Sequence, residues 1–502
     1  MSNIGTTTAT ETLDASTTTA AAPAAGPTTT GTPPTLTTRP AALDAGYPAD
    51  SVTGQTLDDL WHMARAVLDA NWSHNHTVPS RTLYPHQWSW DAAFISIGLA
   101  RVNPQRAWQD LRSLFLAQWP DGRVPHIVFD PNVAERDYFP GPTFWQVPRL
   151  RPGHSDGTGI VQPPAHAIAV WEIYRRSPDD RSLAELRWFY PRLVAAQDYL
   201  LTCRDAGRGG LASIVHPWES GLDNSPAWDA ALSAVPADLG VLAGRQRHDN
   251  RVAAVAHRPT DEDYARFVAL ALAYRDGGYR DDDLPGRHDF VVECPTFNAL
   301  LSAAERALAA IATVIGVDPG PHLARARRIT QAIDERLWNP QTGMYHALDV
   351  RTGRLSPARC VSGLVPLILP DLPAPRAAAL MAMAESARFG ISAAMPVASY
   401  DRTADDFDPV RYWRGPVWIN INWLLCRGLR DHGRPAQAAQ LRTAMLDLVR
   451  RSGYYEYFHP VTGDGVGSAA FSWTAALVLD LLADPEGLDE VTSDQAAAVT
   501  GR

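Results

Sequence analysis

Apolar residues recur at spacings of three and four along most of the central chain, which is the period of an amphipathic helix. The clearest stretch follows Thr260-Asp261-Glu262-Asp263, which resembles a capping box, and its apolar face consists of Tyr264, Phe267, Val268, Ala271 and Leu272. The spacing recurs between Leu300 and Ile311 and between Leu441 and Val449. It predicts further helices over residues 56–72, 90–101, 105–118, 165–177, 182–203, 320–338, 374–388, 415–431 and 469–484.

Strand signals are few and short, so the chain is predicted to be all-α, with about twelve helices. Such helices could form an open α-solenoid or a closed ring of paired helices. A solenoid uses short turns, whereas the loops at 78–91, 119–163, 204–259 and 400–416 are long and rich in Trp, Gly and Pro. Loops of this length usually carry function. They favour a closed α/α toroid with its loops over one mouth.

The two ends of the chain differ from its centre in composition. Residues 1–52 are mostly Thr, Ala and Pro, bury too little apolar surface to fold, and are predicted to be disordered. They lack the basic and apolar regions of a secretory signal, although a surface stalk is an alternative. Residues 486–502 are acidic and Ala-rich and are predicted to fray. One large folded domain is therefore expected over residues 53–485.

Composition excludes several classes of partner. The formal net charge of -10 and the absence of a basic run argue against nucleic acid. No apolar run reaches the ~20 residues that a membrane helix needs. The four cysteines are widely spaced and form no CxxC pair, which indicates reduced thiols and a cytoplasmic protein.

All 45 basic residues are arginine, and the chain contains no lysine. It therefore cannot form a lysine Schiff base, which excludes pyridoxal phosphate chemistry, and it has no Walker-type phosphate loop. His74-Asn75-His76 lies in a polar loop without further ligand candidates. No metal and no cofactor are expected.

Two segments place carboxylates beside aromatic rings. In Trp218-Glu-Ser-Gly-Leu-Asp-Asn-Ser-Pro226, Gly221, Asn224 and Pro226 keep the chain out of regular structure, and Tyr454-Tyr-Glu-Tyr-Phe458 is the second segment. A carboxyl group against apolar surface has a raised pKa and can deliver a proton near neutral pH. Two such acids on a Trp-rich chain suggest cleavage of a glycosidic bond.

Spacing alone does not choose the acids. Asp223 competes with Glu219 and Asp229, because an acid in a loop is more often a helix cap or a surface charge. The same alternative applies to Glu456, which lies far from Asp223 in the sequence.

Four clusters offer the flat apolar faces and polar groups that a pyranose ring needs. A single Trp more often packs in a core, but these Trp residues have polar, Gly or Pro neighbours. The clusters are Tyr84-Pro-His-Gln-Trp88-Ser-Trp-Asp91, Gln162-Pro-Pro164, Trp218 with Gly221, and Tyr412-Trp413-Arg-Gly-Pro-Val-Trp418.

From about Leu83 to about Leu481 the chain resembles glycoside hydrolase family 63, in particular its bacterial mannosylglycerate and glucosylglycerate hydrolase branch. The motifs that carry the resemblance are long and occur in order. Beyond the clusters above they are Gln118-Trp-Pro-Asp-Gly122, Pro125-His-Ile-Val-Phe129, Tyr138-Phe-Pro-Gly-Pro142, Gln162-Pro-Pro-Ala-His166 and Ser472-Trp-Thr-Ala-Ala476.

The resemblance implies an (α/α)6 barrel and an inverting α-glycosidase, with Asp223 as general acid and Glu456 as general base. It implies a sugar pocket of Tyr84, Trp88, Asp91, Gln162, Trp218, Gly221 and Trp418, to which the fourth cluster adds Trp413. In the glycerate-cleaving branch, the acid end of the substrate would meet Tyr138, Arg258, Tyr264 and Tyr412. An Arg fork matches a carboxylate, and the helix start at Thr260 favours an anion.

One position departs from the branch, since Ala470-Phe471 stands where a Gln is usual before Ser472. The expected reaction on a compatible solute such as glucosylglycerate is a single displacement that gives a β-sugar, with the carboxyls about 6.5–9.5 Å apart. Alternatives are a trehalase-like or oligosaccharide-trimming α-glucosidase on the same barrel, and a non-catalytic sugar-binding protein whose carboxylates are expendable. The sequence is compatible with a homo-oligomer, and does not choose between glucose and mannose.

Overall fold

The computed structural model describes residues 56–150, 153–244, 247–392 and 394–484. Twelve helices of more than ten residues lie in these ranges, and each corresponds to a predicted helix. They are α1 (Leu57–Ala70), α2 (Ser89–Leu99), α3 (Pro104–Leu116), α6 (His166–Arg176), α7 (Asp180–Cys203), α10 (Asp261–Asp276), α12 (Pro295–Ile315), α13 (Gly320–Leu337), α14 (Ala374–Glu385), α15 (Ile419–Asp431), α16 (Pro435–Ser452) and α17 (Ser472–Ala483). The predicted leader over 1–52 and the tail over 486–502 lie outside the described residues.

Local chemistry explains several helix ends. Thr260 caps α10, because its Oγ1 accepts a hydrogen bond from the backbone N–H of Asp263 at 3.1 Å, as the sequence predicted. The Asp263 carboxylate returns to the Thr260 hydroxyl rather than to its backbone N–H, so only half of a capping box forms. The predicted helix over 415–431 starts later, at Ile419, because Val417 exchanges backbone hydrogen bonds with Phe458.

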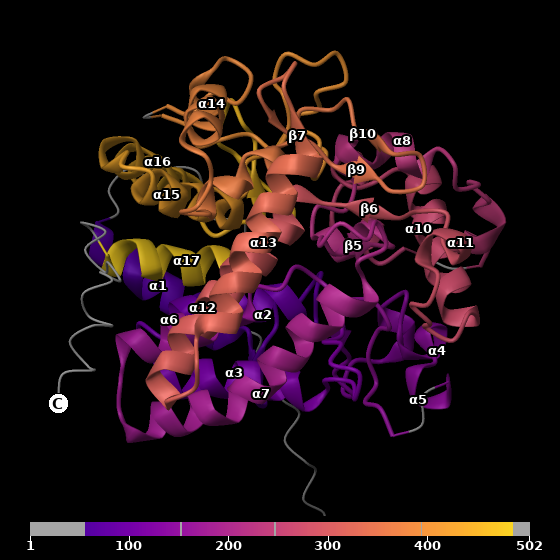
Figure 1. Cartoon of the computed structure of the whole chain (residues 1–502), viewed down its shortest axis with the longest axis horizontal. Coiled ribbons are helices and arrows are strands. Elements are labelled where there is room, and N and C mark those ends of the chain that lie inside the picture. Colours follow the sequence, from indigo (N-terminus) through magenta and orange to yellow (C-terminus); the bar gives the residue numbers. More distant parts are fainter. Residues whose placement is uncertain (1–55, 151–152, 245–246, 393, 485–502) are drawn as a thin grey trace, which may run out of the picture. The chain divides into compact units, whose positions relative to one another are not determined.

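Contacts between neighbouring helices close a ring. They run from α2 to α6, α12 and the short 3-10 helix η8 (Val365–Ile368), then through α15 and α17 back to α2. All residues of α2 are buried, and Gly98 lets it approach α17, since a Cβ there would lie 2.1 Å from the Ala476 carbonyl oxygen. Helices α1, α3, α7, α13 and α16 pack on these inner elements (Figure 1). The closed ring is the arrangement that a toroid requires.

Two of the predicted helices, α10 and α14, belong to neither set, and α14 packs against strand β8 (Met344–Tyr345). Helix α10 packs against η5 (Leu239–Leu242) and α4 (Pro142–Trp145), beside α11 (Leu284–Arg287) in Figure 1. The four-residue helix η8 takes the sixth inner position, and it is too short to produce a helical period. The remaining short α-helices are α5 (Val147–Leu150), α8 (Asp229–Leu232) and α9 (Asp249–Val252).

Every strand in the described ranges has only two residues, in agreement with the weak strand signals. The pairs are β1 (Trp72–Ser73) with β2 (His76–Thr77), β3 (Gln87–Trp88) with β4 (Ile127–Val128), β7 (Trp338–Asn339) with β8 (Met344–Tyr345), and β11 (Tyr457–Phe458) with β12 (Gly465–Val466). A four-stranded antiparallel sheet has the order β10 (Arg354–Leu355), β9 (Leu348–Asp349), β6 (Val292–Glu293), β5 (Ser213–Ile214). These short ladders fix the long loops: β3–β4 carries Trp88, β5 precedes Trp218, and β11 follows Glu456.

Helix α12 is, among the described residues, the one helix long and apolar enough to cross a bilayer by length and composition. In the fold, 67% of its most apolar stretch of 18 residues is buried inside the protein. The helix contacts α6, α7 and α13. It therefore has the environment of a core helix.

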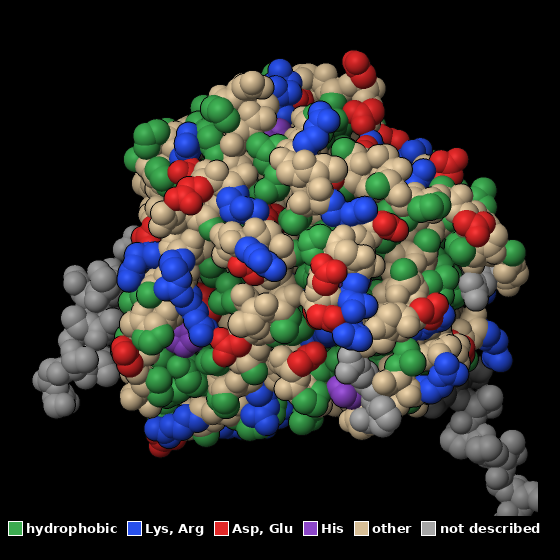
Figure 2. All heavy atoms as spheres, turned by 45° about the vertical axis from the view of Figure 1, so that its right-hand side comes forward, with side chains coloured by type: hydrophobic (Ala, Val, Ile, Leu, Met, Phe, Trp, Pro, Cys, Tyr) green, Lys and Arg blue, Asp and Glu red, His purple; other side chains and the backbone are tan. Residues whose placement is uncertain are grey.

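The surface carries charges of both signs. Figure 2 shows acidic and basic side chains interspersed over one face, without a continuous basic area. This face offers no extended binding surface for a phosphate backbone.

Candidate active site

Two cavities that share lining residues lie among the long loops. The inner cavity is lined by Tyr84, Trp88, Trp90, Asp91, Gln162, Gly221, Asp223, Tyr412, Glu456, Phe471 and Trp473. The outer cavity shares Tyr84, Trp88 and Asp223 with the inner one. Aromatic rings and carboxyl groups line both cavities, which is the kind of lining that a small polar ligand requires.

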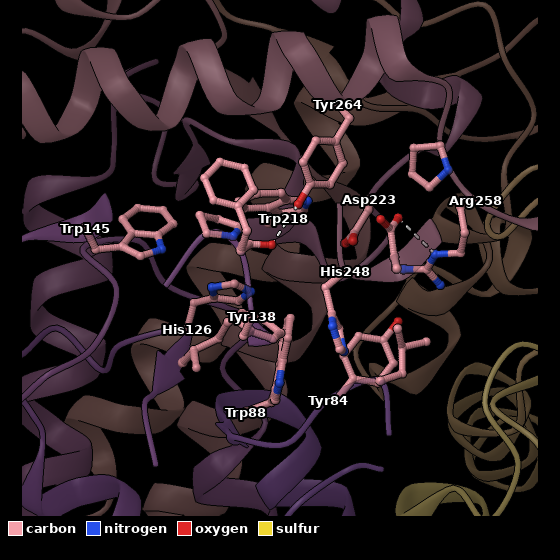
Figure 3. Close-up of a pocket in the computed structure, with 16 residues that line it drawn as sticks. Tyr84, Trp88, His126, Tyr138, Trp145, Trp218, Asp223, His248, Arg258 and Tyr264 are labelled. Atoms are coloured by element: carbon pink, nitrogen blue, oxygen red, sulfur yellow. Dashed lines mark hydrogen bonds and ion pairs between the residues drawn. The ribbon is translucent and has the colours of Figure 1, made fainter. Parts of the chain in front are cut away.

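The structure brings Asp223 and Glu456 together on the inner cavity, although they are far apart in the sequence. Six more predicted site residues line it with them, namely Tyr84, Trp88, Asp91, Gln162, Gly221 and Tyr412. Tyr138, Trp218, Arg258 and Tyr264 line the outer cavity (Figure 3). Of the predicted site residues, only Trp413 and Trp418 are absent from both linings.

Glu456 precedes strand β11 and is held from several sides. Its Oε1 accepts a hydrogen bond from the Tyr84 hydroxyl at 2.7 Å, and its Oε2 accepts one from the backbone N–H of Ser468 at 3.1 Å. The Nη1 of Arg258 lies 3.6 Å from Oε1. Burial raises the pKa of Glu456 above its usual value, and Arg258 and these hydrogen bonds oppose that rise. The site therefore fixes the orientation of this carboxylate and limits the rise of its pKa.

We expect Tyr84→Phe to shift the pH dependence of catalysis. The change removes a donor to the Glu456 carboxylate, so the pKa of Glu456 rises further and the acidic limb of the kcat/KM profile moves to higher pH. Activity at pH 5 should fall by about 10-fold or more, and by less at pH 7. The measurement is kcat/KM between pH 4 and 9 for both proteins. An unchanged acidic limb would separate Tyr84 from the state of Glu456.

Asp223 lies in the loop between the 3-10 helices η3 (Pro217–Ser220) and η4 (Pro226–Trp228). Gly221 turns this loop with φ 69°, and a Cβ there would lie 2.5 Å from the Trp90 ring, so both backbone and space require glycine. Burial, together with the charge of Glu456, raises the pKa of Asp223 to about 7. The sequence prediction of an acid with a raised pKa in this loop agrees with this value.

Glu219, the alternative to Asp223 in the same segment, has its carboxylate fully hydrogen-bonded within the protein. Arg204 donates to both of its carboxylate oxygens at 2.9 Å, and both residues are completely buried. Backbone N–H groups of Val161 and Val215 complete its hydrogen bonds, at 3.2 and 2.7 Å. Glu219 is thus not available to substrate. It ties the loop of Gln162 to the loop of Asp223.

We expect Glu219→Gln to destabilise the fold, because it leaves the buried Arg204 without a full counter-charge. Removing one partner of a buried ion pair costs about 3–5 kcal/mol. Thermal unfolding monitored by circular dichroism should show a clear loss of stability. Glu262→Gln is the matched control, because Glu262 has a side chain 69% exposed. Equal stability of the two variants would contradict the clamping role of Glu219.

One end of the outer cavity is built around Arg258, which is 5% exposed and lies between the carboxylates of Asp249 and Glu456. Its Nε donates to Asp249 at 3.3 Å, and its guanidinium lies 4.0 Å from the centre of the Tyr412 ring. Its Nη1 has no hydrogen-bond acceptor among the described residues. A rigid guanidinium with a spare N–H suits an anionic group of a ligand.

Two tyrosines flank this end. The Tyr264 hydroxyl donates to the Phe139 carbonyl oxygen at 3.1 Å, and the Arg247 guanidinium lies 4.2 Å from the centre of its ring. Tyr138 contacts the His86 ring edge-on, with centroids 4.5 Å apart. Both hydroxyl-bearing rings border the cavity shown in Figure 3.

Trp413 and Trp418 lie behind the cavity wall. Their rings stack on each other at 3.8 Å with an angle of 3°, and both are 1% exposed. The Trp418 indole donates to the Tyr412 carbonyl oxygen at 3.1 Å, and the Trp413 backbone N–H donates to Asn224 at 2.9 Å. These contacts hold Tyr412 and the loop of Asp223 in place.

Several lining residues were not assigned from the sequence. In the outer cavity they include His126, Trp145, His248 and Asp249, and in the inner cavity Trp90, Phe471 and Trp473. His126 belongs to the Pro125-His-Ile-Val-Phe129 motif, which was the available signal. Its position beside Trp88 depends on the pairing of β3 with β4, which the sequence did not reveal.

Comparison with known proteins identifies close relatives. Residues 84–474 match the family model of the mannosylglycerate hydrolase MGH1-like glycoside hydrolase domain. The chain is 42% identical over 442 residues to a mannosylglycerate hydrolase of Rubrobacter radiotolerans, covering 86% of this chain and 99% of the relative. It is 36% identical over 449 residues to a glucosylglycerate hydrolase of Mycolicibacterium hassiacum, covering 85% and 98%.

A solved structure supports the same comparison. The crystal structure of a family 63 mannosylglycerate hydrolase from Thermus thermophilus, in complex with Tris and D-glycerate, matches with a TM-score of 0.78. The two chains are 41% identical, over 84% of this chain and 99% of the other.

Proposed function

Because the chain belongs to the mannosylglycerate hydrolase MGH1-like family of glycoside hydrolases, we propose that it hydrolyses an α-linked glycoside of glycerate with inversion. The substrate is glucosylglycerate or mannosylglycerate. One observation carries the proposal: Asp223 and Glu456 line the same inner cavity, with different partners. A pair of carboxyl groups is what glycoside hydrolysis needs.

In the proposed mechanism, Asp223 is the general acid and protonates the glycosidic oxygen. Its pKa of about 7 supports this role, because a proton is then available near neutral pH. Glu456 is the general base and removes a proton from the attacking water. Its hydrogen bonds from Tyr84 and Ser468 hold one orientation of the carboxylate.

The two cavities divide the substrate. The inner one supplies Asp91, Gln162 and aromatic rings for the sugar, and Gln162 is fixed by accepting the Trp90 backbone N–H at 3.0 Å. The outer one supplies Arg258 for the glycerate carboxylate. The bound D-glycerate of the Thermus relative supports an acidic leaving group.

A substrate panel tests this proposal. Purified protein is assayed with glucosylglycerate, mannosylglycerate, trehalose, kojibiose and nigerose, and released sugar is measured. We expect kcat/KM for at least one glycerate glycoside to exceed every disaccharide by about 100-fold or more, since only glycerate offers an anion to Arg258. A preference for trehalose or another disaccharide would contradict the glycerate assignment.

The pH dependence follows from the acid. Asp223 must be protonated, and its pKa is about 7, so kcat/KM should fall as pH rises above 7, by about 10-fold per pH unit. Burial also raises the pKa of Glu456, which must be ionised to act as a base. The fall of activity on the acidic side should therefore begin at a higher pH than the ordinary pKa of a Glu side chain would give. The measurement is the full profile with the preferred substrate. Undiminished activity at pH 9 would exclude Asp223 as the acid.

We place this reaction in the cytoplasm. All four cysteines are unpaired, and Cys294, Cys360 and Cys426 are buried, which fits a reducing compartment.

A further inference from the structure

His126 is a buried polar side chain without a partner at the wall of the outer cavity. It is 2% exposed, and neither ring nitrogen has a hydrogen-bond partner among the described residues. Its ring contacts the Trp88 ring edge-on at 4.7 Å and lies parallel to the Trp218 ring at 6.1 Å. Buried polar groups in native proteins are nearly always paired, so a group with two free positions at a ligand cavity calls for a ligand.

A neighbouring histidine shows the contrast. The ring of His216 also contacts the Trp218 ring, with centroids 4.5 Å apart, and His216 is also buried. Its Nε2 bonds to the Phe267 carbonyl oxygen at 2.8 Å, and its Nδ1 accepts from the Trp218 backbone N–H at 3.0 Å. His216 is therefore fully used by the protein, whereas His126 is not.

The charge state of His126 limits what it can bind. Burial lowers the pKa of His126 well below its usual value, so the ring is neutral at pH 7. A neutral imidazole carries one N–H donor and one acceptor nitrogen. A carboxylate only accepts and would use one of these positions, while a hydroxyl can use either. His126 therefore suits a hydroxyl, and Arg258 across the cavity suits an acid (Figure 3).

We propose that His126 recognises the free hydroxyl of the leaving group, and that the outer cavity thereby selects a hydroxy acid carrying both a carboxylate and a second hydroxyl. This inference rests on the proposed function. It adds a specificity residue that acts in leaving-group binding, separate from Asp223 and Glu456. Glycerate has both groups: its carboxylate binds Arg258, its 2-oxygen is the glycosidic oxygen beside Asp223, and its 3-hydroxyl binds His126.

Three substrates that differ by one group each test the proposal. All three carry the same α-linked sugar and differ in the leaving group. The leaving groups are glycerate, lactate, which lacks the 3-hydroxyl, and glycerol, which lacks the carboxylate. A site built to bind a hydroxyl rejects the analogue without it, because its own polar group is left unpaired. The wild-type protein should prefer the glycerate over the lactate glycoside by about 30-fold or more in kcat/KM.

His126→Phe keeps a ring of similar shape and removes both polar positions. We expect its preference for glycerate over lactate to fall to about 3-fold or less, while its preference for glycerate over glycerol remains. His126→Gln, which keeps a donor and an acceptor, should recover part of the lost preference. His216→Phe is the matched control: it disturbs the same Trp218 surroundings, and should slow all three substrates without changing the glycerate-to-lactate ratio.

Three results would overturn the proposal. One is a wild-type protein that hydrolyses the glycerate and lactate glycosides equally well, which needs no variant to be folded. Another is a His126→Phe variant whose ratio stays at the wild-type value, which would place the ring against the sugar or in packing alone. In both cases hydrolysis itself continues and the proposed function stands. Failure of the wild-type protein to cleave any of the three substrates would remove the proposed function as well.

Discussion

Asp223→Asn is expected to lower kcat for the glycerate glycoside by about 100-fold to 10⁴-fold, which is the range that general acid catalysis contributes. The amide keeps the size of the side chain but has no proton to transfer. Because the natural leaving group is a poor one, the loss should appear in kcat as well as in kcat/KM. The measurement is steady-state release of glycerate. A variant within about 5-fold of wild type would remove Asp223 from the mechanism.

A substrate with a good leaving group separates proton donation from general damage. An α-glycosyl fluoride needs little help from an acid, so Asp223→Asn should retain far more of the wild-type rate on the fluoride than on the glycerate glycoside. Asp229→Asn is the matched control. Asp229 lies six residues further on, is exposed, and pairs with Arg414, so its loss should leave both rates near wild type. Equal losses on both substrates for Asp223→Asn would indicate misfolding rather than a missing acid.

Glu456→Gln should produce a loss of similar size on the glycerate glycoside, but without sparing the fluoride. The general base is needed whatever the leaving group, so turnover of the glycerate glycoside and of the fluoride should both fall by at least about 100-fold. The change also leaves Arg258 without its neighbouring charge at 3.6 Å, so substrate binding should be measured separately. Asp464→Asn, at the exposed turn of the same β11–β12 hairpin, is the matched control. Retained activity on the fluoride would transfer the base role to another residue.

The helices could be predicted because each long helix has a wide apolar face, as α10 has from Tyr264 to Leu272. Their arrangement could not be predicted in full. Helix α10 has the same apolar period as the helices of the ring, but it packs outside the ring against α4. The sixth inner position is held by η8, where Pro366 lies within four helical residues and no period can develop. Contacts between distant elements decide such positions, and a periodic pattern carries no information on them.

The candidate site was predictable where a motif and a local constraint coincide. Gly221 must be glycine for both its backbone and its contact with Trp90, and the acid two residues later faces the cavity. Tyr264 was ambiguous, since it belongs to an apolar helical face, and the structure shows it both 7% exposed and at the outer cavity.

The rest of the site depends on which way each loop side chain points, and the sequence pattern does not show this. Tyr412, Trp413 and Trp418 share the same sequence signals, yet only Tyr412 lines a cavity. Adjacent residues of a turn project differently, and Tyr412 is held at φ 45°. His126 was missed for the same reason, because its position follows from the pairing of Trp88 with Ile127.

The most direct test of the account is proton NMR of fresh product. Wild-type protein is added to an α-glycosylglycerate in buffered heavy water, and the anomeric signal of the released sugar is followed from the first minutes. We predict that the β-anomer appears first, together with glycerate, and that mutarotation produces the α-anomer later. Initial release of the α-anomer would contradict a single displacement between Asp223 and Glu456.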